Sequence, residues 1–369
     1  MSDTTAFHII RRRDLLAADC YAQWQDPDQI ARPSPAKRRT LLDNPCAGSD
    51  DEPVQVIATR DNLVIGRIDV IPAWMRVGNE KIQIFWGSHL YVPERFRNTL
   101  TGVLLILKTQ ALHHTVGAFG PSQLALPVYQ KLKWIDHPIP RYIAIRRSRP
   151  VVDRYVGRGP HSAILATLTD GVLAFHRGIQ SIGRSLRSGG LRLQRLDAMP
   201  EELDPLLAAR PNVVAVHRSA AFINWWLTHS FEEDPRSAND LFLIRDRAGR
   251  PLGYFLNKVR FHETATHRGF KDVLLGSLQD WMIFDPQRLN LRTILLLAAR
   301  ELGRRRVHAI DFCTDDASLR LTLRLMGFMR IGALHLMIKA APGSPLGLPE
   351  FSDPSTWWIR PADGDNFFV

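Results

Sequence analysis

Apolar residues of this chain occur in short blocks of two kinds. In some blocks they recur at every second residue, as in a strand, and in others at every third or fourth residue, as in a helix. FHIIRR, VQVIATR and LVIGRIDVIP are β-rich runs, and KIQIFWGSHLYV is a longer one. The pair Asp61-Asn62 between the second and third runs is typical of a tight hairpin turn. Two segments predict helices: TGVLLILKTQALHH, by its helical spacing, and DLLAADCYAQW, which begins at the capping residue Asp14.

The second half of the chain repeats this order. LFLIRD, PLGYFLNKVRF and DVLLGSLQDWMIF predict strands, NLRTILLLAARELG a helix, and VHAIDFC a further strand. Pro93 follows the long strand of the first half and lies 36 residues before Tyr129. Pro286 follows the long strand of the second half and lies 37 residues before Leu323. Similar spacing of similar elements predicts an internal duplication.

A chain of 369 residues is longer than one hydrophobic core usually serves. We therefore expect an α/β (α+β) fold with two related domains, each a mixed, mostly antiparallel sheet flanked by helices. The expected divisions are 1–150 for the first domain, 151–190 for a basic helical connector, 191–341 for the second domain, and 342–369 for a tail.

The formal net charge of +11 is concentrated in the middle of the chain. The segment from Arg141 to Arg195 holds eleven arginines and two aspartates, a net charge of +9, so the rest carries +2. Such a local excess favours an anionic partner at one place. Apolar residues recur there at steps of three and four: Leu165, Leu168, Val172, Phe175, Ile179, Ile182 and Leu186. This stripe predicts a helix laid across the domains or, alternatively, one that contacts an anionic membrane surface.

Other features narrow the class of protein. No apolar run approaches the roughly 20 residues that a membrane-spanning helix needs, and the first residues do not resemble a signal peptide. The three cysteines are isolated, which fits neither a disulfide framework nor a zinc site. We expect a cytoplasmic protein with no bound metal.

The segment VPERFRNTLTG, residues 92–102, joins the long strand of the first half to the following helix. A helix N-terminus offers unpaired N–H groups and the positive end of the helix dipole, and both attract phosphate. The small residues Asn98, Thr99 and Thr101 can also donate hydrogen bonds there. The layout therefore predicts a phosphate-binding turn, although it contains few glycines.

Together, this order of elements, VPERFRNTLTG and PVYQKL resemble the GNAT acyltransferase family. In that family an Arg, two residues, Gly, one residue and Gly precede the helix, and the backbone holds the pyrophosphate of acyl-coenzyme A. Here Arg97 matches the Arg and Gly102 the second Gly, whereas Leu100 replaces the first Gly. The resemblance implies that acyl-coenzyme A, such as acetyl-coenzyme A, is the co-substrate. It would be bound by Leu90, Tyr91, Val92, Arg97, Asn98, Thr99, Leu100, Thr101, Gly102 and Val103.

The resemblance also implies catalytic residues. Tyr129 in VYQKLKW matches the tyrosine that protonates the leaving thiolate, a task that suits a weak, well-placed acid. The second half has Leu323 at that position and no glycine in its loop, so the first half is expected to be catalytic. Candidates for the base that receives the amine proton are His89, whose ordinary pKa is near 6.5, Glu94 and Glu80.

Three functions remain open from the sequence. The tandem arrangement and the ending STWWIRPADGDNFF are similar to bacterial proteins of polysaccharide or cell-envelope synthesis, which implies an amino-sugar, small-molecule or envelope-precursor acceptor. Fem-type ligases, which use aminoacyl-tRNA, also pair two GNAT-like domains, but nucleic acid is the less favoured partner. A scaffold protein that has lost its phosphate site is the non-enzymatic alternative.

Overall fold

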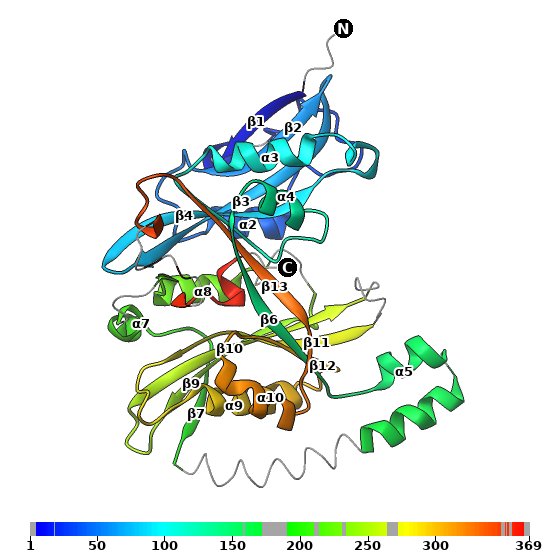
Figure 1. Cartoon of the computed structure of the whole chain (residues 1–369), viewed down its shortest axis with the longest axis vertical. Coiled ribbons are helices and arrows are strands. Elements are labelled where there is room, and N and C mark those ends of the chain that lie inside the picture. Colours follow the sequence, from blue (N-terminus) through cyan, green and yellow to red (C-terminus); the bar gives the residue numbers. More distant parts are fainter. Residues whose placement is uncertain are drawn as a thin grey trace. The chain divides into compact units, whose positions relative to one another are not determined.

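The structure is a computed structural model of the whole chain (Figure 1). It describes residues 5–17, 19–157, 159–171, 190–209, 214–230, 234–263, 272–347, 351, 353 and 356–364. Contacts divide the chain into two compact units, each made of separate segments. Unit 1 comprises 1–138, 200–232 and 334–369, and unit 2 comprises 139–199 and 233–333.

Unit 1 is built on a mixed sheet. Its strands follow the order β1, β2, β3, β4, β5 and β13, and all neighbours are antiparallel except the parallel pair β4 and β5. A short strand, β8 (Val214–Val216), also pairs with β3. The bounds are β1 Thr5–Arg11, β2 Pro53–Arg60, β3 Leu63–Val77, β4 Glu80–Tyr91, β5 Thr115–Phe119 and β13 Met329–Ala340.

Helices cover both faces of this sheet. The helix α3 (Thr101–Gln110) packs on one face (Figure 1). Its Leu105 contacts apolar residues of β2 and β3. On the other face α2 (Pro35–Leu42) reaches β3 through Lys37. The other helices in the described part of the unit are α1 Arg12–Leu16, α4 Leu126–Lys131, α7 Asp204–Ala208 and α8 Ala220–Thr228.

A glycine sets how closely α3 approaches the sheet. A Cβ atom at Gly66 of β3 would lie 3.1 Å from Leu105 and 3.2 Å from both Thr101 and the carbonyl of Tyr91. These distances are tighter than ordinary contacts, so a larger residue would push the first turn of α3 away from the end of β4. Gly66 thus helps to hold the N-terminus of α3 beside β4.

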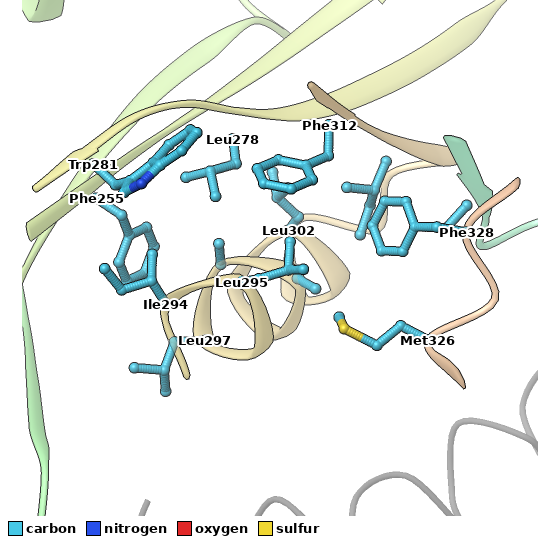
Figure 2. Packing of buried hydrophobic residues seen from close by; sticks show 14 of the residues in the cluster. Phe255, Leu278, Trp281, Ile294, Leu295, Leu297, Leu302, Phe312, Met326 and Phe328 are labelled. Carbon is cyan, nitrogen blue, oxygen red and sulfur yellow. The ribbon is translucent and has the colours of Figure 1, made fainter. Parts of the chain in front are cut away.

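Unit 2 repeats the plan of unit 1. Its strand order is β7, β9, β10, β11, β12 and β6, again with one parallel pair, β11 and β12. The helix α9 (Leu291–Arg304) packs on the sheet, and its leucines meet Phe255, Trp281 and Phe312 in the main core (Figure 2). The bounds are β6 Ile135–Ile145, β7 Arg192–Leu196, β9 Ala238–Arg245, β10 Pro251–His262, β11 Val273–Ile283, β12 Ala309–Cys313, α5 Arg149–Val156 and α10 Arg320–Leu325.

The two strand orders correspond position by position, except that the sixth strands are exchanged. In unit 1, β13 from the end of the chain pairs with β5 through Leu336–Ala340. In unit 2, β6 from the first half pairs with β12 through Arg141–Ile145. The chain therefore passes from one unit to the other within β6 and returns within β13. Because of this exchange, the units do not coincide with the continuous ranges 1–150 and 191–341.

The predicted fold class is confirmed: two related units, each with a mixed, mostly antiparallel sheet and flanking helices. The helix predicted from Asp14 to Trp24 is wrong in extent, because α1 begins at Arg12 and ends at Leu16. Asp14 accepts a hydrogen bond from the Arg11 backbone N–H at 2.7 Å, as the third helical residue. The pattern also missed two short helices: α2, which is rich in polar residues, and α8, which is largely apolar and buried.

The predicted connector is only partly described. Residues 149–156 (α5) and 160–171 are helical. Leu165 and Leu168, the first two members of the predicted stripe, are 44% and 65% exposed. The other five members, Val172, Phe175, Ile179, Ile182 and Leu186, lie outside the described residues.

Candidate functional site

The loop between β4 and α3 forms a helix N-terminus that no side chain caps. Leu100 occupies the N-cap position and makes no side-chain capping bond. Within the described chain, the Thr101 N–H has only a long contact, 3.3 Å, to Thr99 Oγ1, and the N–H groups of Gly102 and Val103 have no protein acceptor. These donors and the positive end of the helix dipole point out of the turn, which is the arrangement that binds an anion.

Arg97 and Leu100 flank this turn. Arg97 is exposed, and its Nε donates to the Val92 carbonyl at 3.2 Å, which holds the side chain along the loop. Leu100 is 69% exposed and has φ −75°, a conformation open to any residue. The backbone therefore does not require glycine at position 100. Only the volume of the leucine side chain distinguishes this turn from one with glycine there.

Gly102 leaves open space beside the turn. A Cβ atom at this position would meet only Val92, at an ordinary 3.8 Å. The fold itself thus has room for a side chain at position 102. Asn98 and Thr99 complete the loop, and the Thr99 hydroxyl donates to the Phe96 carbonyl at 2.6 Å.

The strands β4 and β5 diverge close to this turn. They pair over Phe85–Gly87 with 116–118, and in the described chain β4 continues alone on this edge from Ser88 to Tyr91. The backbone of Leu90 and Tyr91 is therefore exposed along an edge that leads to the N-terminus of α3. An extended ligand with amide groups can add to such an edge in the way that a peptide strand does.

His89 lies where the two strands separate. The pairing of β3 with β4 shifts register between Arg67 and Asp69, which forms a β-bulge opposite His89. His89 has φ +48°, which is uncommon for a residue other than glycine. Its side chain is 26% exposed. Strained backbone of this kind is frequently found at functional sites.

A buried polar cluster surrounds the Nδ1 atom of His89. Asp69 Oδ2 lies 3.7 Å from this nitrogen, and the Ser88 hydroxyl lies 2.6 Å from it. Asp69 is fully buried and also pairs with Lys37 and accepts from Gln55 Nε2 at 3.0 Å. Burial by itself would raise the pKa of the Asp69 carboxyl, but Lys37, Arg67 and His89 outweigh it and lower that pKa. Asp69 is therefore ionised at neutral pH.

Tyr129 lies on the opposite face of the sheet from Asp69. It is 3% exposed, and its ring packs edge-on against Trp134 with centroids 4.7 Å apart. Its cluster includes Val70, and Leu90 packs against that cluster. Since successive residues of a strand point to opposite faces, Asp69 points away from this cluster. Tyr129 and the polar cluster around Asp69 thus lie on opposite faces of the sheet.

The two glutamate candidates occupy different places. Glu94 lines a surface depression of about 500 Å³ together with Asp28, Tyr91, Pro93 and Arg95. Arg95 forms an ion pair with Asp28 at 2.6 Å. Glu80 lies at the other end of β4, nine residues or about 30 Å of strand from His89. The structure thus places Glu94 at the loop and Glu80 at the far end of β4 from it.

The corresponding helix of unit 2 has a different N-terminus. β11 and β12 also pair only over a short stretch, 275–277 with 309–311 in the described chain, and the pairing of β10 with β11 also has a register shift. However, α9 is capped by Asn290, whose side chain accepts from the Thr293 N–H at 2.9 Å. One N–H group in the first turn of α9 is therefore already paired, whereas the equivalent N–H groups of α3 are open in the described chain.

The polar cluster was not found from the sequence. Lys37, Gln55, Asp69 and Ser88 come from α2, β2, β3 and β4, and only the folded sheet brings them together. An aspartate within the apolar run LVIGRIDVIP was the available signal. The described residues contain no group of side chains with the composition of a metal site. Among those same residues, no helix is both long and apolar enough to cross a bilayer.

Comparison by sequence finds no match, neither to a family model nor to a curated protein. Comparison by structure finds the same fold in several proteins. N-myristoyltransferase from Saccharomyces cerevisiae with bound myristoyl-CoA superposes with a TM-score of 0.57 at 12% identity, over 98% of this chain and 84% of that one. The same enzyme with myristoyl-CoA and inhibitors gives 0.54 at 12% identity, over 96% and 85%.

A protein from Enterococcus faecalis V583, described as a probable N-acyltransferase, gives a TM-score of 0.51 at 9% identity, over 93% of this chain and 74% of that one. At such identities the likeness establishes the fold alone. This chain therefore shares its two-unit fold with N-myristoyltransferase.

Proposed function

We propose that this protein is an N-acyltransferase that moves an acyl group from acyl-coenzyme A to an amine. The observation that carries the proposal is the uncapped N-terminus of α3 beside the unpaired edge of β4. The helix end suits the pyrophosphate of coenzyme A, and the strand edge suits the amide groups of its pantetheine arm. The structures with bound myristoyl-CoA, which share this fold, support the same ligand class.

In this proposal, unit 1 binds the coenzyme. The turn from Arg97 to Val103 holds the pyrophosphate, and the stretch from Leu90 to Val92 aligns the pantetheine arm toward the point where β4 and β5 separate. The amine nitrogen attacks the thioester carbonyl carbon, and the carbon–sulfur bond breaks. Tyr129 protonates the leaving thiolate, and His89 or Glu94 accepts the proton that the amine loses.

The acceptor is an amine of a small molecule, an amino sugar or a precursor of the cell envelope. The +9 segment from Arg141 to Arg195 favours an acceptor that carries negative charge. The setting that we propose is the cytoplasm. Unit 2, whose helix α9 is capped by Asn290, does not bind coenzyme in this proposal.

The test is calorimetric titration of the purified protein with coenzyme A and acetyl-coenzyme A, repeated on Leu100→Gly. We expect micromolar binding, about −8 kcal/mol, and tighter binding by Leu100→Gly because the exposed leucine occupies space next to the phosphate. Release of thiol from acetyl-coenzyme A in the presence of an amine panel then tests the transfer. Absence of coenzyme binding in both proteins would refute the proposal, and salt-sensitive RNA binding instead would favour a tRNA-dependent ligase.

A further inference from the structure

We propose that Asp69 and Lys37 position His89 so that its Nε2 atom accepts the proton of the acceptor amine. This inference rests on the proposed function, and it assigns positioning roles to two residues on β3 and α2. It stands on the geometry of the buried cluster: a fully buried carboxylate, a buried lysine paired with it, and a histidine at a β-bulge whose Nδ1 faces that carboxylate.

The cluster is costly if its only role is stability. Lys37 and Asp69 are 4% and 0% exposed, and Gln55 and Ser88 are also buried. Replacing a buried ion pair by apolar residues of similar volume is often neutral or stabilising. The cluster sits beneath α2, where apolar side chains would join the two elements equally well. A function for the charge is therefore the better explanation of its presence.

The cluster selects one tautomer of His89. The Ser88 oxygen and the Asp69 carboxylate both lie near Nδ1, at 2.6 Å and 3.7 Å, and the carboxylate can only accept. Its negative charge favours a proton on Nδ1, with the Ser88 hydroxyl oxygen as the acceptor. A neutral imidazole with its proton on Nδ1 has its lone pair on Nε2, which is the form a general base requires.

Neighbouring cations keep the ring available as a base. The charged and titratable groups around Asp69 and His89 include Lys37 of α2, Arg67 of β3 and Tyr21 of the segment before α2. Tyr21 donates to Gln55 at 3.1 Å, and burial raises the pKa of its hydroxyl, so it stays neutral. Two cations next to one carboxylate oppose a permanent positive charge on the imidazole.

The position of His89 suits the reaction. It lies two residues beyond Gly87, the last residue of β4 that pairs with β5. A ligand that starts at the N-terminus of α3 and runs along β4 from Tyr91 passes four residues, about 13 Å of strand, before it reaches Gly87. Its reactive end therefore comes close to His89. The amine proton passes to Nε2, the new carbon–nitrogen bond forms, and the thiolate leaves with a proton from Tyr129.

The direct test is nuclear magnetic resonance of the histidine side chains of the full chain, with His89 assigned by its loss in His89→Gln. Long-range nitrogen–proton correlations report which ring nitrogen carries the proton. We expect Nδ1–H in the native protein and a change to Nε2–H in Asp69→Asn. An Nε2–H ring in the native protein, or the same tautomer in Asp69→Asn, would overturn the inference.

Asp69→Asn removes the carboxylate that pairs with the buried Lys37, so its folding is checked by thermal unfolding. The double variant Lys37→Met, Asp69→Leu removes both charges and retains the volume of the pair. We expect the same change of tautomer in this folded variant. A folded double variant that keeps Nδ1–H would also refute the role of Asp69.

Kinetics provide the second test, with thiol release from acetyl-coenzyme A and an amine from the panel. We expect His89→Gln to lower kcat by about 100-fold or more, with the KM for acetyl-coenzyme A little changed. In Asp69→Asn the acidic limb of the pH profile of kcat/KM should move to lower pH, because removal of the carboxylate disfavours the protonated imidazole of His89. An unmoved limb contradicts the inference, since a merely structural residue would change the rate without moving the limb.

The proposed function and the positioning of His89 by Asp69 can be refuted independently of each other. If the His89 tautomer depends on Asp69 but coenzyme does not bind, the proposed function is wrong and the positioning of the ring stands. If acetyl-coenzyme A is consumed with the amine but His89 carries its proton on Nε2, the function stands and the present inference is wrong.

Discussion

Substitution of Gly102 by aspartate separates the stability of α3 from its ability to bind an anion. Gly102 is the second residue of α3, and the space beside it admits a side chain without a clash. Aspartate is a better helix residue than glycine, and a negative charge in the first turn interacts favourably with the helix dipole by about 0.3–1 kcal/mol. We therefore expect the variant to be at least as stable as the native protein.

Coenzyme binding should change in the opposite direction. If a carboxylate lies about 5 Å from each of two phosphate charges, Coulomb's law at an effective dielectric constant of about 40 gives about 1.7 kcal/mol per pair. The total of about 3 kcal/mol corresponds to a loss of affinity of more than about 100-fold. The loss should shrink as salt is added, because part of it is screened.

The assay is calorimetric titration with coenzyme A at two salt concentrations, together with thermal unfolding of the same samples. Gly102→Ala shows the effect of a side chain without charge. Thr293→Asp is the matched control, since it adds one negative charge to the first turn of α9 in unit 2, where we expect no effect on coenzyme binding. If Gly102→Asp is folded and binds coenzyme within about threefold of the native protein, the pyrophosphate does not lie at the N-terminus of α3.

Four further predictions concern single residues. Tyr129→Phe should slow thiol release by about 100-fold and leave coenzyme binding intact, because only the hydroxyl is lost from a ring packed on the core; normal turnover would refute its role as the acid. Arg97→Glu should weaken coenzyme binding in calorimetry, because it reverses the charge of an exposed side chain at the loop, and unchanged affinity would place the phosphates elsewhere. Asp363→Asn should lower the free energy of unfolding by about 3–5 kcal/mol, because it removes the negative charge that lies 2.6 Å from the fully buried Arg218; denaturant titration checks this, and a change below about 1 kcal/mol would contradict it. Burial and nearby cations lower the pKa of His217 to about 4 from its usual 6.5, so the unfolded chain binds the extra proton first and stability falls between pH 6.5 and 4; His217→Gln should make that fall shallower in acid-unfolding curves, and an identical curve would exclude this histidine as a cause.

The sequence by itself determined the order of the elements. The strands β2, β3 and β4 and the helices α3 and α9 follow from hydrophobic period and turn residues, which are local properties. The turn Asp61-Asn62 has positive φ at both residues, as a tight hairpin requires. The internal duplication was likewise readable, because it is a repetition of local patterns. The loop with Arg97 and Gly102 could be located for the same reason.

Tertiary structure alone decided three other features. The exchange of β6 and β13 depends on which strand edges meet, and the sequence of a strand does not specify its partner. Whether another side chain of the loop reaches the first N–H groups of α3 depends on the folded path of that loop, whereas the capping of α9 by Asn290 is a local property. The cluster around Asp69 joins residues that are distant along the chain, and pairing over such distances is set by the fold as a whole.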